Sequence, residues 1–568
     1  SPGEPIIVHV PSLTSQAALR RSGIVPVTDL AKYKAARQPL LLLDEQTGRR
    51  QMIWGELDAN PVPAASRNLI IHPAKNLVPG RRYVVVLRNL RDRTPAGLWR
   101  TASPALKAAL RKAKVAETSV YLTWDFTVAS DRSLTARMLK MRNEAFARLG
   151  DRNLADGTIA GRPPAYAVTG VTDFTAAENP RIARTISGTF TVPCYLDQPG
   201  CPPGARLHYS SKSPDALPTQ MPGNVQLAKF QCNIPRAAFA KAGRIAIYGH
   251  GLLFSRKQID EDNIQDMSAE HDMTFCATDW SGMSEEDVPN AIKALGDFNN
   301  FPTLPDRLQQ GVLNTLYLGR LLAHPQGFAA NAAFRGPGGA ALLDTSALFF
   351  DGNSQGAIIG GMATALAPDW RRAVLGVATM DFATLLPRST DFDAYSLFFT
   401  PAYKDGGERL LILSLAQMLW DRGETDGWAH HVTTSPPAGT PTHTVLMHVA
   451  VGDHQTANVM SDVEARTIGA SAYRPAVDRG RSSDVTPLYG IPTIPRFPFA
   501  GSAIVYWDGG PQTPLPPTTN TPPRTGLDPH TFPRSSPAAR EQKSRFLSRG
   551  GAVVNVCGGK PCHTSNYK

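Results

Sequence analysis

An apolar run that passes through Gly-Asn-Ser-Gln-Gly into a segment of small residues constrains this chain more than any other feature. Residues 348–351 read Leu-Phe-Phe-Asp, and Gly352, Ser354 and Gly356 follow at a spacing of two. Residues 357–363 are then rich in alanine and glycine. The pattern predicts a strand, a tight turn that exposes the serine, and a closely packed helix. Glycines flank the serine because side chains there would collide with the neighbouring strand and helix.

Strand-like and helix-like segments alternate from about residue 165 onward, which is typical of a largely parallel sheet covered by helices on both faces. We therefore predict an α/β fold with an eight-stranded, mostly parallel sheet. The expected strands are residues 186–193, 225–232, 244–248, 273–278, 347–351, 373–379, 443–451 and 503–507. Helical insertions are expected at 288–324 and about 381–442, and repeated prolines predict an extended loop over 511–533.

The first 164 residues have a different pattern. Short apolar runs separated by Pro, Gly and Asn predict a β-rich module, with accessory helices at residues 104–114 and 133–149. A connector containing Gly and Pro ends near Pro164. The chain is long enough for at least two domains. We expect an N-terminal module over 1–164 and a larger domain over 165–568.

A serine hydroxyl becomes a strong nucleophile when a base removes its proton and an acid holds that base in place. In a strand–turn–helix site of this kind the acid follows the serine in the chain, and the base follows the acid. Asp453 stands just after the strand expected at 443–451 and is the predicted acid. Asp381, just after the strand expected at 373–379, is the alternative acid.

Three histidines follow Asp453, namely His454, His530 and His563. His454 is the immediate neighbour of the acid and is poorly placed to bridge it to the serine. His563 lies in a cysteine-containing tail. His530 stands in a loop between the last strand and the terminal helix, so it is the predicted base.

An oxyanion hole needs two backbone amides aimed at the carbonyl oxygen of a substrate. The residue after the serine, Gln355, supplies the first. The strand at 244–248 runs into Gly-His-Gly-Leu-Leu, so the second amide belongs to Leu252 or Leu253, and Leu252 is our choice. His250 and Gly251 are expected to shape this turn.

The six cysteines indicate disulfides. Two pairs are separated by seven and by five residues across Gly/Pro turns, as a short disulfide loop requires. Connectivity does not follow from sequence, and the expected pairs are Cys194–Cys201, Cys232–Cys276 and Cys557–Cys562. No pair has the Cys-x-x-Cys spacing of a metal site, so no metal is expected. Disulfides favour a secreted, extracellular protein.

The formal net charge of +11 raises the question of nucleic-acid binding. Lysine and arginine are scattered without a long basic run, so a solvated basic surface is the better interpretation and no nucleic-acid partner is expected.

No apolar run reaches the roughly 18 residues of a membrane-spanning helix. The sequence begins at Ser1, so we expect a mature chain without its signal peptide. The alternating charges of Asp421, Arg422 and Glu424 indicate an internal ion pair.

Residues 165–568 resemble the α/β-hydrolase superfamily through the Gly-Asn-Ser-Gln-Gly turn, the Gly-His-Gly-Leu turn and the later aspartate and histidine. More narrowly, the chain is similar to secreted bacterial lipases and esterases with an Ig-like N-terminal domain, the virulence-factor lipase type. The resemblance implies Ser354 as nucleophile, His530 as general base, Asp453 as its orienting acid, and Leu252 with Gln355 as oxyanion donors. It also implies ester hydrolysis without a cofactor. The proline-rich loop before His530 departs from the family pattern.

The predicted function is a secreted serine hydrolase that cleaves carboxylic esters through an acyl-enzyme on Ser354. Its substrate would be a small-molecule, lipid or polymeric ester, and the sequence does not select among these. A serine amidase or peptidase, or a polyester depolymerase, would use the same triad. The non-enzymatic alternative is a binding or adhesion protein that keeps the scaffold.

Overall fold

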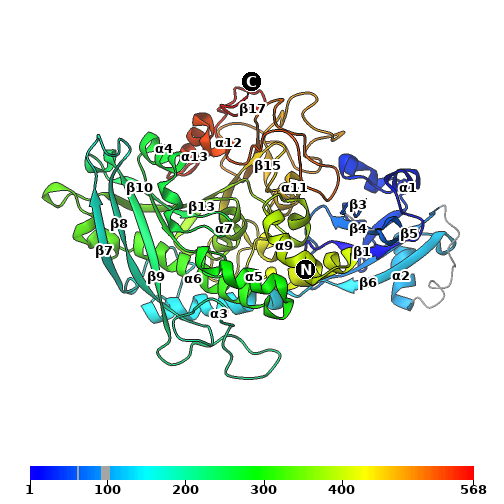
Figure 1. Ribbon diagram of the computed structural model, residues 1–568, viewed down its shortest axis with the longest axis horizontal. Coiled ribbons are helices and arrows are strands. Elements are labelled where there is room, and N and C mark those ends of the chain that lie inside the picture. Colours follow the sequence, from blue (N-terminus) through cyan, green and yellow to red (C-terminus); the bar gives the residue numbers. More distant parts are fainter. Residues whose placement is uncertain (61–62, 91–102, 568) are drawn as a thin grey trace.

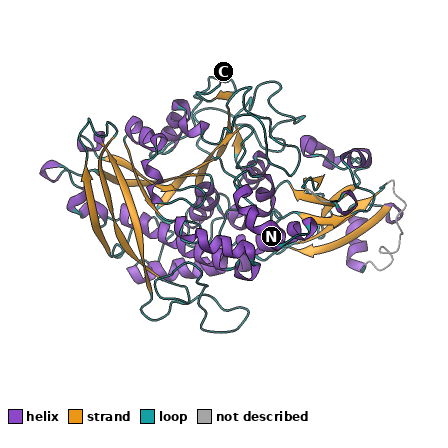
Figure 2. Cartoon of the chain, in the orientation of Figure 1, coloured by secondary structure: helices purple, strands orange, loops and turns teal. Residues whose placement is uncertain are grey.

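The structure is a computed structural model and describes residues 1–60, 63–90 and 103–567. Figure 1 shows the N-terminal strands at one end of the molecule and the antiparallel strands β7, β8 and β9 at the other. Helices and the remaining strands fill the region between them (Figure 2).

The N-terminal strands form two three-stranded antiparallel sheets, in the orders β1-β4-β3 and β2-β5-β6. Their apolar residues are buried in a shared core that includes Leu42, Ile71 and Val85. The strands are β1 (Ile6–His9), β2 (Leu40–Asp44), β3 (Ile53–Leu57), β4 (Asn68–Pro73), β5 (Arg82–Arg88) and β6 (Val120–Thr127). The accompanying helices are α1 (Gln16–Ser22), the 3-10 helix η1 (Val27–Lys34) and α2 (Pro104–Lys112).

Helix α3 (Asp131–Leu149) falls within the range expected for the N-terminal module, yet it packs on the larger part of the chain. Ser130 caps its first turn and Gly150, at φ 97°, ends it. The hydroxyl of Tyr317 donates to the carbonyl of Ala145, and the Phe146 ring meets Tyr317 edge-on. These contacts tie α3 to the long helix α6.

The larger part of the chain is built around a mixed sheet of 11 strands, in the order β7-β8-β9-β11-β10-β12-β13-β14-β16-β15, with β17 also paired to β16. The strands from β11 to β16 run parallel, whereas β7, β8 and β9 are antiparallel to their neighbours. The strands are β7 (Tyr166–Asp173), β8 (Ile182–Pro193), β9 (Val225–Pro235), β10 (Gly243–Gly249), β11 (Met273–Thr278), β12 (Leu343–Asn353), β13 (Trp370–Gly376), β14 (Thr444–Ala450), β15 (Ser471–Ala472), β16 (Ala503–Asp508) and β17 (Cys562–His563).

Alternate residues along the parallel strands face two separate cores. Ile245 and Ile247 of β10 belong to one core, and Ala246 and Tyr248 belong to the other. Both faces are therefore covered, which explains why these strands are continuously apolar in sequence. The helices are α4 (Asp262–His271), α5 (Val288–Gly296), α6 (Thr303–Ala323), α7 (Gln355–Leu366), α8 (Phe382–Leu385), α9 (Phe392–Ala402), α10 (Gly406–Trp420), α11 (Asn458–Ile468), α12 (Phe532–Ser535) and α13 (Pro537–Phe546).

Each of the eight expected strand segments overlaps a strand of this sheet, and the sheet is larger than expected by β7, β15 and β17. The insertion expected at about 381–442 contains α8, α9 and α10, followed by the 3-10 helix η13 (Asp426–His431). The proline-rich stretch contains no helix or strand before α12.

Three disulfides join the cysteines, as Cys194–Cys201, Cys232–Cys276 and Cys557–Cys562. Cys232 and Cys276 are directly opposite each other on the antiparallel pair β9 and β11, which fixes the extension to the parallel strands. Within the described ranges, no helix is long and apolar enough to cross a membrane.

Candidate active site

The Gly-Asn-Ser-Gln-Gly segment forms a sharp turn between β12 and α7. Ser354 has φ 58° and ψ −128°, a strained conformation for a residue with a side chain. A Cβ atom on Gly352 would lie 2.1 Å from the carbonyl oxygen of Gly356, and one on Gly356 would lie 2.0 Å from that of Gly249. Only glycine fits at either position. This turn joins an apolar central strand to a buried helix, which is the strand–elbow–helix arrangement of the α/β-hydrolase fold.

Asp453 and His530 are in direct contact. The two carboxylate oxygens of Asp453 lie 2.9 and 3.0 Å from Nδ1 of His530. Asp453 follows β14, and His530 lies in the loop just before α12. Both side chains are buried. The acid and the base that the sequence predicted, far apart in the chain, are therefore held together by a charge-assisted hydrogen bond.

The loop around Asp453 supplies further donors to its carboxylate. The backbone amides of Gln455 and Thr456 donate to one oxygen, at 2.8 and 3.0 Å, and the Thr456 hydroxyl donates to the other at 2.8 Å. Burial alone would raise the pKa of Asp453. The nearby His530 and these hydrogen bonds outweigh burial and hold the pKa of Asp453 below its usual value. Asp453 is thus kept ionised, as an orienting acid must be.

No hydrogen bond joins Ser354 to His530 in this structure. Neither the Oγ of Ser354 nor the Nε2 of His530 makes a hydrogen bond within the described ranges. Catalytic hydrogen bonds are often long in free enzymes and tighten only around a substrate. Ser354 nevertheless shares one cavity with Gln455 and Thr456, which places the nucleophile beside the loop that holds Asp453.

Two backbone amides beside Ser354 have no protein acceptor. The amides of Leu252 and Gln355 donate to no group in the described part of the chain. The amide of Leu253 points to the side-chain oxygen of Gln355, at 3.4 Å. Leu253 adopts φ 51°, so the chain turns sharply between these two leucines. Of the two alternatives that the sequence left open, Leu252 has the free amide.

His250 holds the loop after β10 in place. Its Nδ1 lies 2.9 Å from the carbonyl oxygen of Gly251, and its Nε2 accepts from the backbone amide of Trp280 at 2.9 Å. Complete burial lowers the pKa of His250 to about 4. A neutral ring with both nitrogens occupied stiffens a loop and is a poor proton carrier. The side-chain nitrogen of Gln355 adds two bonds, to the carbonyls of Gly251 and Met283.

Ser354 opens into a mostly apolar cavity of about 90 Å³. Its walls come from the loop after β10, from α5 and α6, and from the helical insertion. The apolar side chains are Leu252, Leu253, Met283, Ala291, Leu295, Phe301, Leu304, Ile358, Phe382, Leu385, Leu386, Phe392 and Trp420. The polar ones are Ser354, Gln355, Ser389, Asp391, Tyr395, Gln455 and Thr456. Such a lining suits an apolar group attached to a polar reacting centre.

Asp381, the alternative acid, belongs to a different environment. It accepts from the amide and the hydroxyl of Thr384 at the start of α8 and does not contact His530. Burial, with the charges of Asp426 and Glu424 nearby, raises the pKa of Asp381 well above its usual value. A carboxyl that is hard to ionise is a poor orienting acid, so the geometry favours Asp453.

Asp381 is one of five fully buried carboxyl groups that lie close together, here called the carboxyl cluster. The members are Asp381, Asp421, Glu424, Asp426 and Glu464. The side chain of Gln417 donates to both Asp421 and Glu424, so the interpretation of residues 421–424 as an internal ion pair is wrong. Within the described ranges, no three His, Cys, Asp or Glu side chains are arranged to hold a metal ion.

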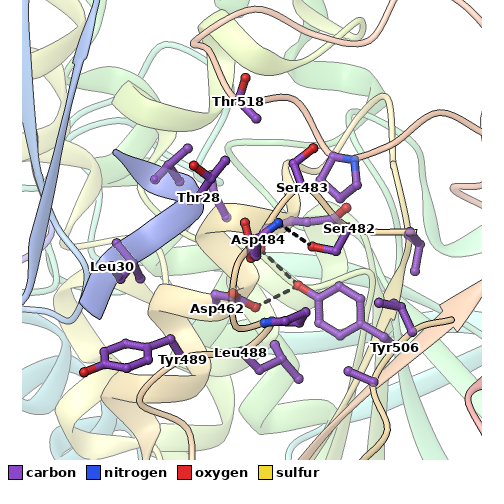
Figure 3. Close-up of a pocket in the computed structure, with 18 of the residues that line it drawn as sticks. Thr28, Leu30, Asp462, Ser482, Ser483, Asp484, Leu488, Tyr489, Tyr506 and Thr518 are labelled. Atoms are coloured by element: carbon purple, nitrogen blue, oxygen red, sulfur yellow. Dashed lines mark hydrogen bonds between the residues drawn. The ribbon is translucent and has the colours of Figure 1, made fainter. Parts of the chain in front are cut away.

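A second cavity, of about 70 Å³, lies between η1, α11 and the loop that carries Asp484. Figure 3 shows Tyr506 pointing toward Asp462, whose carboxylate accepts its hydroxyl at 2.7 Å. Asp484 has a pKa raised to about 7 because it is largely buried and faces Asp462. No nucleophile predicted from sequence lines this cavity. Of the residues predicted from sequence to be catalytic, Ser354 lines the other cavity.

Sequence reasoning missed the part of the site that comes from the insertion. Asp391, Phe392 and Tyr395 line the cavity, although residues 381–442 were expected only to be helical. The acid-rich segment at 391–393 was the available signal. It reads equally well as the ordinary preference for acidic residues at a helix start.

Comparison with protein-family models gave no match, and comparison with curated proteins gave none either. Similar solved structures include an acetyl xylan esterase from Thermoanaerobacterium sp., with 13% identity, TM-score 0.32 and coverage of 58% of this chain and 87% of that one. An acetyl xylan esterase from Paenibacillus sp. has 11% identity and TM-score 0.32, covering 58% and 88%. A glucuronoyl esterase from Teredinibacter turnerae has 9% identity and TM-score 0.28, covering 57% and 71%. Such remote likeness carries no weight for function, which rests on the geometry of the site.

Proposed function

We propose that the chain is a serine esterase of the α/β-hydrolase superfamily, with Ser354 as nucleophile, His530 as general base and Asp453 as its orienting acid. The observation that carries the proposal is the hydrogen bond between His530 and Asp453, together with the strained Ser354 in a cavity that is also lined by Gln455 and Thr456 from the loop of Asp453. The two unpaired amides of Leu252 and Gln355 support an oxyanion hole at the same place.

The reaction proceeds through an acyl-enzyme. Oγ of Ser354 attacks the ester carbonyl carbon while Nε2 of His530 takes the hydroxyl proton. The oxyanion of the tetrahedral intermediate accepts from the amides of Leu252 and Gln355, which need no reorganisation. His530 then gives its proton to the leaving alcohol oxygen as the carbon–oxygen bond breaks. Water then attacks the acyl carbon while His530 takes its proton, and His530 returns that proton to Oγ of Ser354 as the acyl–oxygen bond breaks and the carboxylic acid leaves.

The apolar cavity walls support an ester with a hydrophobic acyl group. Side chains such as Leu304, Phe301 and Trp420 lose water when an alkyl chain packs against them, and each methylene buried contributes about 0.8 kcal/mol. No catalytic step in this mechanism calls for a cofactor. The proposal covers lipid, polymeric and small-molecule esters as substrates.

We place the protein outside the cell, in keeping with its three disulfides, which are stable in oxidising compartments. The proposed division is an N-terminal module over 1–164 and a hydrolase domain over 165–568, with α3 as the segment that fastens one to the other through α6. The six strands of the N-terminal sheets support the β-rich character of the module.

The test is hydrolysis of p-nitrophenyl butyrate and of the matching anilide by the full chain and by Ser354→Ala. We expect ester turnover that falls by at least about 10⁴-fold in the variant, with little turnover of the anilide. Faster turnover of the anilide would move the chain to the amidases. Ester turnover that survives Ser354→Ala would contradict the proposal.

A further inference from the structure

A carboxylate from the helical insertion lies beside the proposed catalytic pair. Thr390 connects the start of α9 to the loop after β14, because its amide and its hydroxyl both donate to the carbonyl oxygen of His454, at 2.9 and 3.2 Å. The next residue, Asp391, lines the same cavity as Ser354. The insertion therefore places an acid in the wall of this cavity, next to the loop that carries Asp453.

Asp391 is the only ionisable acid or base among the described residues that line this cavity, apart from the weakly acidic Tyr395. Its carboxylate accepts no hydrogen bond and makes no ion pair within the described ranges, since only its backbone amide is bonded, to Ser389. The neighbouring acid Asp393 has a partner, because Arg524 binds both of its oxygens. A half-buried carboxylate left without a donor is available to a ligand.

The charged and titratable groups around Asp391 are known. They are His530, Asp453, Asp528 and Asp393, together with Tyr395 one turn along α9. Burial is the main reason that the pKa of Asp391 is raised, and the charge of His530 opposes that rise. Asp528 is already occupied, because it accepts from the side chain of Gln455 and from two backbone amides. Among the described residues of this group, Asp391 and Tyr395 line the cavity, and Asp391 is the one carboxylate of the two.

The position of His530 tells which part of a substrate meets Asp391. His530 must protonate the oxygen of the departing alcohol, so the alcohol group lies on the histidine side of Ser354. Asp391 is on that side, because the preceding Thr390 is bonded to the carbonyl oxygen of His454, and the amide of His454 donates to the same Asp528 oxygen as the amide of His530. The apolar residues Leu304 and Phe301 come instead from α6 and the turn before it, and they suit the acyl group.

We propose that Asp391 selects the alcohol part of the substrate, and that it favours esters whose alcohol carries a hydrogen-bond donor, such as a second hydroxyl group. The proposal rests on the proposed esterase function. A carboxylate accepts strongly from hydroxyl groups, whereas a plain alkyl alcohol would leave the half-buried acid without a donor and an anionic alcohol would be repelled. The preferred substrates are thus partial esters of polyols or sugars rather than esters of simple alkyl alcohols.

The experiment compares butyrate esters that differ only in the alcohol: ethyl, 2-hydroxyethyl, choline, and the anionic glycolate. The choline arm separates positive charge from hydrogen-bond donation, because its ammonium group has no N–H. The readout is kcat/KM for each ester relative to the ethyl ester, at pH 8. The variants are Asp391→Asn, Asp391→Glu as the conservative rescue, and Asp393→Asn as a control on the same helix.

We expect the 2-hydroxyethyl ester to be preferred by the unaltered chain, and this preference to fall by about 10-fold in Asp391→Asn, as loss of a bond to a charged group implies. Asp391→Glu should restore part of it, Asp393→Asn should leave it unchanged, and Asp391→Asn should accept the glycolate ester better. An unchanged ratio in Asp391→Asn, or a preference for choline alone, overturns the inference. Absence of ester turnover in the unaltered chain would instead overturn the esterase proposal.

Discussion

Replacing Gly356 by alanine tests whether the turn at Ser354 is held by backbone packing. The new Cβ would lie 2.0 Å from the carbonyl oxygen of Gly249 and 2.4 Å from its carbonyl carbon, whereas ordinary contact begins at 3.4 Å. Neither atom belongs to a flexible side chain. The end of β10 and the start of α7 would therefore have to separate by roughly 1 Å, and both are buried.

The expected cost has two parts. Forcing an extra group into a packed interior lowers the free energy of unfolding by about 1 to 3 kcal/mol. The same displacement moves the amide of Leu252 away from that of Gln355, and a misplacement of about 1 Å can reduce kcat/KM about 100-fold. Both effects should appear together, because one contact causes them.

The assay is urea unfolding together with kcat/KM for p-nitrophenyl butyrate, with Gly296→Ala as the matched control. A Cβ on Gly296 meets nothing within 4 Å, and this residue is the last of α5, so the control should lose neither stability nor activity. If Gly356→Ala keeps both its unfolding midpoint and its kcat/KM, the argument from packing at the elbow is refuted.

Three further predictions follow from the same contacts. In steady-state kinetics, Asp453→Asn should lower kcat by about 10⁴-fold, while Asp381→Asn should retain most of the activity. A larger loss of kcat in Asp381→Asn than in Asp453→Asn would identify Asp381 as the acid. Folding raises the pKa of Glu424 to about 7 from an ordinary 4.5, so the folded chain holds a proton that the unfolded chain has lost, and the urea midpoint should fall as pH rises from about 4.5 to 7. Glu464→Gln removes another carboxyl with a raised pKa from the same cluster and should weaken this fall. A midpoint that rises over that pH range would contradict the prediction. Replacing Cys232 and Cys276 by alanine should lower the free energy of unfolding by about 4 kcal/mol, against about 2 kcal/mol for Cys557 and Cys562. The reason is that the first disulfide closes a loop of 44 residues and the second a loop of 5. Equal losses of unfolding free energy would show that loop entropy is not the cause.

The strands and the elbow could be predicted from sequence because their signals are local. The Leu-Phe-Phe-Asp run and the glycines on each side of Ser354 meet the steric demands of one short segment. Asp453 and His530 could also be chosen, since each follows an expected strand in a fixed order along the chain. Their mutual hydrogen bond is a contact between distant segments, and only the structure reports it.

Features that depend on the direction of a side chain could not be predicted. Asp421 and Glu424 flank Arg422, and their spacing suggested an ion pair, but both carboxyls turn into the protein toward Gln417. Strand β7 was missed because Tyr166–Asp173 follows a Gly/Pro connector and itself contains Gly170. Asp391 looked like an ordinary helix-start acid, and its place in the cavity depends on how the whole insertion docks.

The central claim is that Ser354 is an activated nucleophile, and covalent labelling measures this directly. The folded chain would be treated with a fluorophosphonate, digested, and analysed by mass spectrometry for the modified peptide. The account predicts one adduct, on Ser354, which forms far more slowly in Asp453→Asn and His530→Ala and is absent after denaturation. An unlabelled Ser354 in the folded chain, or labelling that is indifferent to His530, would contradict it.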